Sequence, residues 1–173
     1  MIPKICFTAG GVLIHENKVL LVKHKKLGMW LNPGGHIETN ELPHHAAERE
    51  YFEETGIKVE AWNPQCLVSK NIFDQGYFIP NPIATNVHWV CKENFVQRQH
   101  QGDEYMPQKT WSRGCEKHCN FLYLVRPLAT VDFTQNIEET EGIQWFSEHE
   151  LQSLVTDEDI KVETLHAFSL VRE

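Results

Sequence analysis

The stretch PGGHIETNELPHHAAEREYFEETGI, residues 33–57, decides the expected fold of this chain. Its second part predicts a helix from about Glu41 to Thr55, because Pro43 is tolerated in a first helical turn and Gly56 is a residue type that commonly ends a helix. Its start, residues 33–35, predicts a bend in which the backbone comes close to another part of the molecule. We therefore expect a bend followed by a helix at the chemical centre of the protein.

Three glutamates of the expected helix, Glu50, Glu53 and Glu54, share one face, because residues three and four positions apart lie on the same side of a helix. The small residues Ala46 and Ala47 share this face, so the carboxylates form a shallow polar floor. Like charges at these spacings destabilise an isolated helix by about 0.2–0.5 kcal/mol per pair. Mg²⁺ and Mn²⁺ prefer oxygen ligands, which makes the cluster a candidate metal site. The helix alone leaves a solvated acidic face open as the alternative.

The wider spacing of these residues is more specific than the helix. Five residues separate Gly35 from Glu41, and seven more separate Glu41 from the segment REYFEETGI at 49–57. This pattern resembles the Nudix box, G-x5-E-x7-R-E-U-x-E-E-x-G-U, where U is a bulky aliphatic residue. Every fixed Gly, Glu and Arg of the box is present. Tyr51 replaces an aliphatic residue on the packing side of the helix, which leaves the acidic side intact.

The resemblance implies an α/β fold. Nudix proteins are α/β/α sandwiches around a mixed sheet, with the box as a loop-helix-loop, and we expect one such domain over residues 1–173. The residues themselves are compatible, because strand-like and helix-like segments alternate. Most of the chain between residues 58 and 117 gives no clear pattern. We expect strands over 4–15 and 18–24, joined by a turn at Glu16-Asn17, and two further strands over 84–93 and 118–127. A helix is expected to begin after Ser147, which would cap it together with Glu150 three residues later.

The resemblance also implies a metal site. The box glutamates of Nudix enzymes hold a divalent cation, which assigns Mg²⁺ or Mn²⁺ to Glu50, Glu53 and Glu54, with the backbone carbonyl of Gly34 as a further ligand. Arg49 would orient a glutamate. Bound metal neutralises charge on a diphosphate and lowers the pKa of bound water.

The implied reaction is hydrolysis of a nucleoside diphosphate linked to another group, including nucleoside triphosphates in a housekeeping role. The general base is not fixed in the family and is either a box glutamate or a carboxylate on another loop. Glu139 is the candidate that we choose among Glu138, Glu139 and Glu141, and Glu104 is a weaker one. An exposed loop carboxylate is the alternative for each. The catalytic candidates are Arg49, Glu50, Glu53 and Glu139.

The charge balance restricts the partners. Sixteen Lys and Arg stand against 24 Asp and Glu, a net charge of -8, so a role in coating a nucleic-acid polymer is not expected. A small nucleotide remains a suitable substrate, because metal covers the carboxylates before phosphates arrive. No P-loop or Rossmann glycine motif is present. The apolar run 5–14 is shorter than the roughly 20 residues that span a membrane, and we expect a cytoplasmic protein. A homodimer is left open.

The five cysteines are an odd, scattered set, so we expect reduced thiols rather than a disulfide framework. Cys115, His118 and Cys119 suggest zinc, with His88, Cys91 and His100 upstream. However, their spacing lacks the paired pattern of structural zinc sites, and adjacent strand residues face opposite sides of a sheet. Zinc binding by Cys115, His118 and Cys119 therefore stays open as the weaker alternative to ordinary thiols.

Two other classes of function remain as alternatives to the hydrolase. One is a Nudix-fold sensor that binds a nucleotide or nucleotide sugar without turnover, and the other is an acidic protein whose glutamates only solvate a helix. The complete set of box glutamates favours the hydrolase. Substrate identity stays open, because spacing does not separate core aromatics from those that stack on a base. The aromatic candidates are Phe7, Trp30, Phe73, Tyr77, Phe78, Trp89 and Trp145.

Overall fold

The N-terminal hairpin is formed as the sequence predicts. The computed structural model describes residues 1–64, 72–73, 76–102 and 113–172. Within them β1 (Ile5–His15) and β2 (Lys18–His24) pair antiparallel. Glu16 and Asn17 join the two strands with positive φ angles of 47° and 58°, as a two-residue turn matched to the strand twist requires.

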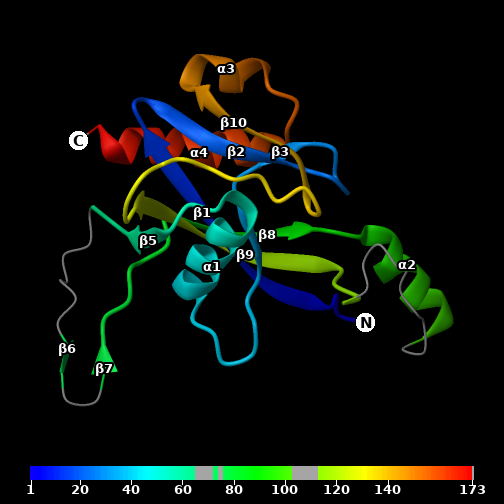
Figure 1. Cartoon of the computed structure of the whole chain (residues 1–173). Coiled ribbons are helices and arrows are strands. Elements are labelled where there is room, and N and C mark those ends of the chain that lie inside the picture. The colour runs from blue at the N-terminus through cyan, green and yellow to red at the C-terminus, as the bar shows by residue number, and fades with distance from the viewer. Residues whose placement is uncertain (65–71, 74–75, 103–112, 173) are drawn as a thin grey trace.

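Eight strands of the described residues form one mixed sheet (Figure 1). β1 and β9 are parallel, whereas all other neighbours are antiparallel. This arrangement confirms the expected α/β class with a mixed central sheet. The order along the sheet is β10 (Thr140–Ser147), β2, β1, β9 (Lys117–Pro127) and β5 (Val59–Trp62). Three further strands pair with members of this row: β3 (Trp30–Leu31) with β2, β4 (Gly34–His36) with β1, and β8 (Ala84–Trp89) with β9. The short strands β6 (Ile72–Phe73) and β7 (Gly76–Tyr77) form a separate pair.

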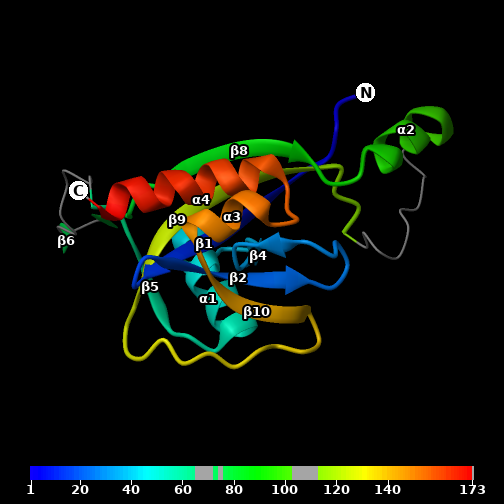
Figure 2. The same ribbon diagram turned by 90° about the horizontal axis from the view of Figure 1, so that it is seen from above.

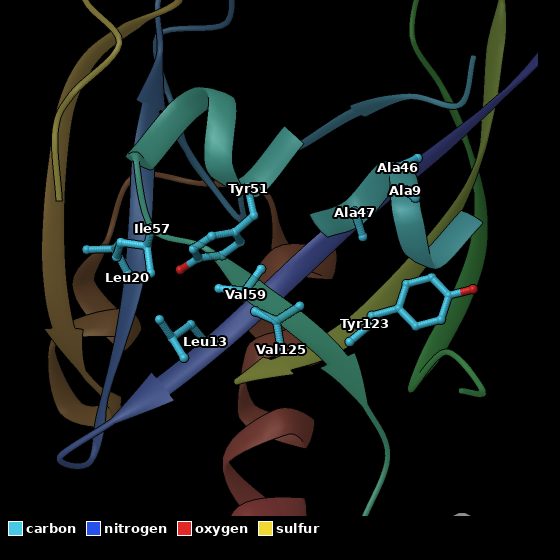
Figure 3. Close-up of a cluster of buried hydrophobic side chains, with 11 residues drawn as sticks. Ala9, Leu13, Leu20, Ala46, Ala47, Tyr51, Ile57, Val59, Tyr123 and Val125 are labelled. Carbon is cyan, nitrogen blue, oxygen red and sulfur yellow. The ribbon is translucent and has the colours of Figure 1, made fainter. Parts of the chain in front are cut away.

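Helices cover both faces of the sheet (Figure 2). On one face α1 (Pro43–Thr55) packs against the odd-numbered residues of β1, including Ala9 and Leu13, and Figure 3 shows this cluster. On the other face α3 (Glu148–Ser153) and α4 (Glu158–Val171) pack against even-numbered residues such as Val12. Because successive strand residues point to opposite faces, one strand supplies both cores.

The helix α1 follows its prediction closely. It begins at Pro43 rather than Glu41 and ends at Gly56, whose φ of 73° is in the left-handed region that glycine adopts readily. Tyr51 is fully buried against the sheet, so the departure from the aliphatic pattern lies on the packing side as expected. Ala46 and Ala47 are also buried in this core, which corrects the expectation that they lie beside the carboxylates on an open polar floor.

Two helices were not foreseen. α2 (Lys92–Gln101) begins inside the segment expected as a strand over 84–93, because β8 ends at Trp89. α4 follows the expected helix start, which is confirmed by the reciprocal capping bonds of Ser147 and Glu150. No helix in the described part of the chain is long and apolar enough to cross a bilayer.

The expectation of reduced cysteines is wrong for one pair. Cys6 and Cys115 form a disulfide across 109 residues of sequence. The parallel ladder of β1 and β9 places Cys6 beside His118, and Cys115 lies directly before β9. Only this long-range pairing brings the two thiols together, so the sequence spacing carried no sign of it. Cys91 and Cys119 are free.

Candidate functional site

A cleft of about 750 Å³ opens beside the helix α1. Its lining includes Glu50 and Glu54 of α1 and Gly34 and Gly35 of β4. The loop before β10 contributes Glu138 and Glu139. The cleft thus brings carboxylates of α1 together with carboxylates of the loop before β10, beside Gly34 and Gly35. These two glycines were expected in a bend and instead belong to the strand β4.

The three box glutamates have different environments. Glu54 is only 4% exposed, and its Oε2 accepts a hydrogen bond of 3.0 Å from the backbone N–H of Gly34. The Glu50 carboxylate lies so close to Gly35 that a Cβ there would be 2.4 Å from it. Glycine is therefore required at position 35 for this approach. Glu53 is half-exposed at the outer end of the cluster.

Arg49 ties the cluster to the bend. Its guanidinium donates two hydrogen bonds to the carboxylate of Glu41, at 2.8 and 2.9 Å. It also donates to Glu50 at 2.8 Å, to Glu53 at 3.2 Å and to the backbone carbonyl of His36 at 3.0 Å. Hydrogen bonds to Glu41 and Glu50 raise the pKa of Arg49 above its usual value, although burial opposes this. One side chain thus fixes the orientation of three glutamates, and its role in catalysis stays a prediction.

Negative charge is crowded in this cluster. Burial raises the pKa of Glu54 to about 8, with further increases from Glu50, Glu139 and Glu53, whereas the hydrogen bond from Gly34 opposes the shift. Burial also raises the pKa of Glu50, although its contact with Arg49 opposes this. Carboxylates in such a site ionise readily only when a cation compensates them. An all-oxygen donor set fits Mg²⁺ or Mn²⁺, so these residues suit the metal that the resemblance implies.

The loop carboxylates divide into two groups. Glu138 and Glu139 line the cleft, and the charge of Glu139 contributes to the raised pKa values of Glu50 and Glu54. Glu141 lies in β10 and pairs with Lys23 at 3.6 Å. Glu104 lies outside the described residues. The geometry therefore brings Glu139, but not Glu141, to the box glutamates.

The lining of the cleft also includes polar side chains that sequence reasoning missed. Thr8 of β1 donates a hydrogen bond to Asn120 of β9 at 3.1 Å, and Asn86 of β8 donates to Glu163 of α4. Burial raises the pKa of Glu163. The sequence held one sign of these residues, the alternation of side chains along β9. His118 and Asn120 lie on the same face of the strand as the core residues Leu122 and Leu124.

The histidines and cysteines do not group as the sequence suggested. Cys119 is in register with the exposed residues Phe7 and Val87, so it points away from the cleft and does not join Cys115 and His118. The group formed within the described chain is Cys6, His36 and Cys115. Burial, with nearby His36 and His88, lowers the pKa of His118 to about 4.

The aromatic candidates give no clear base-stacking residue. Trp89 borders the cleft, whereas Trp30 packs edge-on against Phe146. The side chain of Phe73 lies outside the described residues. Recognition of a substrate is therefore better sought among the polar residues of the sheet wall.

Comparison with known proteins relates this geometry to a family. A family model described as NUDIX domain matches residues 6–168. The uncharacterized Nudix hydrolase YvcI of Bacillus subtilis is 44% identical over 54 residues, which cover 31% of this chain and 33% of that protein. The alignments with this relative and with a MutT-like protein of Streptomyces ambofaciens span only about a third of those proteins' lengths.

Solved structures are similar over nearly the whole chain. A hydrolase of the NUDIX family from Clostridium perfringens superposes with a TM-score of 0.71 at 29% identity, covering 95% of this chain and 97% of that one. Since the family model also spans most of the sequence, the chain belongs to the Nudix family.

Proposed function

We propose that this protein hydrolyses the diphosphate linkage of a small nucleotide-type substrate with the help of a divalent cation. The observation that carries the proposal is that Glu50 and Glu54 line the cleft, with Glu54 buried and its pKa raised to about 8. Glu53 is held beside them by Arg49, which also binds Glu50. A solvated acidic face does not fit, because it would leave Glu50 and Glu54 exposed, whereas both side chains are largely buried. The sensor alternative keeps the same site and differs only in turnover.

Each residue of the cluster has a proposed role. Glu50, Glu53, Glu54 and the carbonyl of Gly34 would hold Mg²⁺ or Mn²⁺. Such a cation would neutralise the charge of the diphosphate and lower the pKa of an attacking water. Arg49, bound to three carboxylates, keeps the ligands oriented, and the hydrogen bond from Gly34 fixes Glu54.

Cationic side chains at the cleft offer a place for the phosphates. Lys25 and Lys26 of the loop after β2 line the cleft together with the carboxylates. A phosphate chain would thus lie between the lysines and the cation site. The remainder of the substrate would then face the polar wall formed by Asn86, Asn120 and Glu163.

The experiment is a release assay for phosphate and nucleotide. The panel contains nucleoside triphosphates, oxidised nucleotides, ADP-ribose, dinucleoside polyphosphates and coenzyme A, each with Mg²⁺, Mn²⁺ or a chelator. We expect turnover of at least one compound with metal and none with the chelator. Binding of nucleotide and metal without any product would instead support the sensor.

Glu139 is proposed as the general base. Glu139→Gln is expected to lower kcat by about 10²–10⁴-fold, with a smaller change in KM, because the variant keeps its shape but cannot accept a proton. Glu141→Gln is the matched control, since Glu141 pairs with Lys23, and its kcat should stay close to that of the parent. Comparable kcat values for the parent and Glu139→Gln would assign the base to another residue.

A further inference from the structure

A second cluster of potential metal ligands lies at the N-terminal ends of β1 and β9, where His36, Cys115 and His118 line the same cleft as Glu50 and Glu54. Ligand atoms of Cys6, His36 and Cys115 lie within 4.8 Å of one another. Nε2 of His36 is 3.4 Å from Sγ of Cys115. Two ligands of one tetrahedral zinc ion are about 3.6 Å apart when one is nitrogen and the other sulfur, given the usual bond lengths. The observed separation is therefore suited to a shared zinc ion.

His118 lies beside this group, outside the set of ligand atoms that are within 4.8 Å of one another. His118 is in register with Cys6 on the neighbouring parallel strand, so the two side chains point to the same face of the sheet. The ring centroids of His118 and His36 are 4.9 Å apart. Nε2 of His118 is buried and has no hydrogen-bond partner in the described part of the protein. A buried polar nitrogen without a partner is costly, and coordination of a metal would satisfy it.

We propose that the reduced protein binds a zinc ion through the thiolates of Cys6 and Cys115 and the imidazoles of His36 and His118. Two cysteines and two histidines are a common ligand set of structural zinc sites. The four residues do not follow the regular sequence spacing of known structural zinc sites, because they come from different strands. Cys6 lies in β1, His36 in β4 and His118 in β9, and Cys115 lies just before β9. The inference is independent of the proposed hydrolysis.

The disulfide and the zinc ion exclude each other, because a cysteine binds zinc as a thiolate and a disulfide sulfur is not a thiolate. Conversion requires a reductant, such as a low-molecular-weight thiol, RSH. Two RSH and Zn²⁺ react with the Cys6–Cys115 disulfide to give the zinc dithiolate, one RSSR and two protons. Two electrons pass from the RSH sulfurs to the protein disulfide, and each cysteine releases its proton on binding the metal. Oxidation by RSSR reverses these steps and releases zinc.

Co²⁺ titration tests the proposal, because cobalt occupies zinc sites and reports thiolate ligation by a charge-transfer band. The full-length protein is reduced with a phosphine, which is then removed, and Co²⁺ is added with excess Mg²⁺ to occupy carboxylate sites. We expect one equivalent of Co²⁺ with a thiolate charge-transfer band and tetrahedral visible bands, displaced by Zn²⁺. The disulfide form, with its fold intact, should show neither signal.

Variants separate the proposed ligands from other thiols. Cys6→Ser and Cys115→Ser should weaken the charge-transfer band, and His118→Gln should weaken zinc binding by at least about tenfold. Cys119→Ser is the matched control, since this free cysteine faces the other side of the sheet, and it should leave the spectrum unchanged. Circular dichroism verifies that each variant is folded. Absence of the band in reduced protein, or its loss in Cys119→Ser alone, would overturn the proposal.

Discussion

Glu54→Gln is expected to lower kcat/KM for diphosphate hydrolysis by about 10²–10³-fold and, in the same protein, to stabilise the metal-free fold at pH 8. The loss follows because glutamine removes a charged ligand from the cation site. Its amide oxygen still accepts the hydrogen bond from Gly34 that Glu54 accepts at 3.0 Å. The backbone beside the site is therefore preserved while the charge is lost.

The gain in stability has a defined pH window. The pKa of Glu54 is raised from 4.5 to about 8 in the folded protein. A raised pKa stabilises the fold while the group is protonated, and this contribution is fully present below pH 4.5 and is lost as pH rises through 8. Metal-free parent protein should thus lose stability over this range, by up to about 4 kcal/mol, and Glu54→Gln should lose less.

Thermal unfolding with chelator between pH 5 and 9, beside hydrolysis assays with Mg²⁺, measures both effects. Glu60→Gln is the control, because Glu60 pairs with Arg126 at 3.0 Å and neither residue lines the cleft. Glu60→Gln should change neither the dependence of the unfolding temperature on pH nor the rate of diphosphate hydrolysis. Equal pH slopes for Glu54→Gln and the parent, or full activity of the variant, would contradict the role of Glu54.

Glu116→Gln is expected to destabilise the fold by about 3–5 kcal/mol, because it leaves the buried guanidinium of Arg98 with a weakened partner. The Glu116 side chain is only 1% exposed, and its carboxylate accepts two hydrogen bonds from Arg98, at 2.7 and 2.8 Å. It also accepts one from the backbone N–H of Lys4 at 2.8 Å. The pair thus attaches α2 and the N-terminal segment to the start of β9. Urea unfolding measures the loss of stability in Glu116→Gln.

The pH dependence of stability is a second sign of the same pair. The hydrogen bonds from Arg98 lower the pKa of Glu116, although burial opposes them. The stabilisation of the fold by Glu116 is therefore fully present above the ordinary carboxyl pKa of 4.5, and it is lost as the pH falls through the lowered pKa of Glu116. Glu60→Gln, which breaks the exposed pair with Arg126, should cost less than about 1 kcal/mol. Similar losses in the free energy of unfolding for Glu116→Gln and Glu60→Gln would show that the buried pair stabilises the fold no more than the pair at the surface.

Local signals explain why much of the fold could be predicted. Gly56 ends α1 in the left-handed conformation, and Ser147 and Glu150 form the capping box at α3. The β1–β2 hairpin likewise follows from a polar two-residue turn between apolar runs. Each of these features depends on residues within a few positions of one another. Sequence patterns are informative where the physical cause is local.

Long-range packing explains what could not be predicted. The box spacing shows that Glu50, Glu53 and Glu54 share a helix face, but it does not show that Glu54 is buried while Glu53 is half-exposed. That difference depends on how β4 lies against α1. The Cys6–Cys115 disulfide likewise depends on the parallel pairing of strands more than 100 residues apart. The roles of the site residues stay predictions.

Titration of Mn²⁺ followed by electron paramagnetic resonance tests the cation site most directly, because the signal of free Mn²⁺ falls on binding and no substrate need be known. The disulfide form is used, so that Cys6 and Cys115 cannot bind metal. We expect saturable binding by the parent protein and at least about tenfold weaker binding by Glu54→Gln, with Glu60→Gln unchanged. Equal Mn²⁺ binding by the parent and Glu54→Gln would contradict a cation site at the box glutamates.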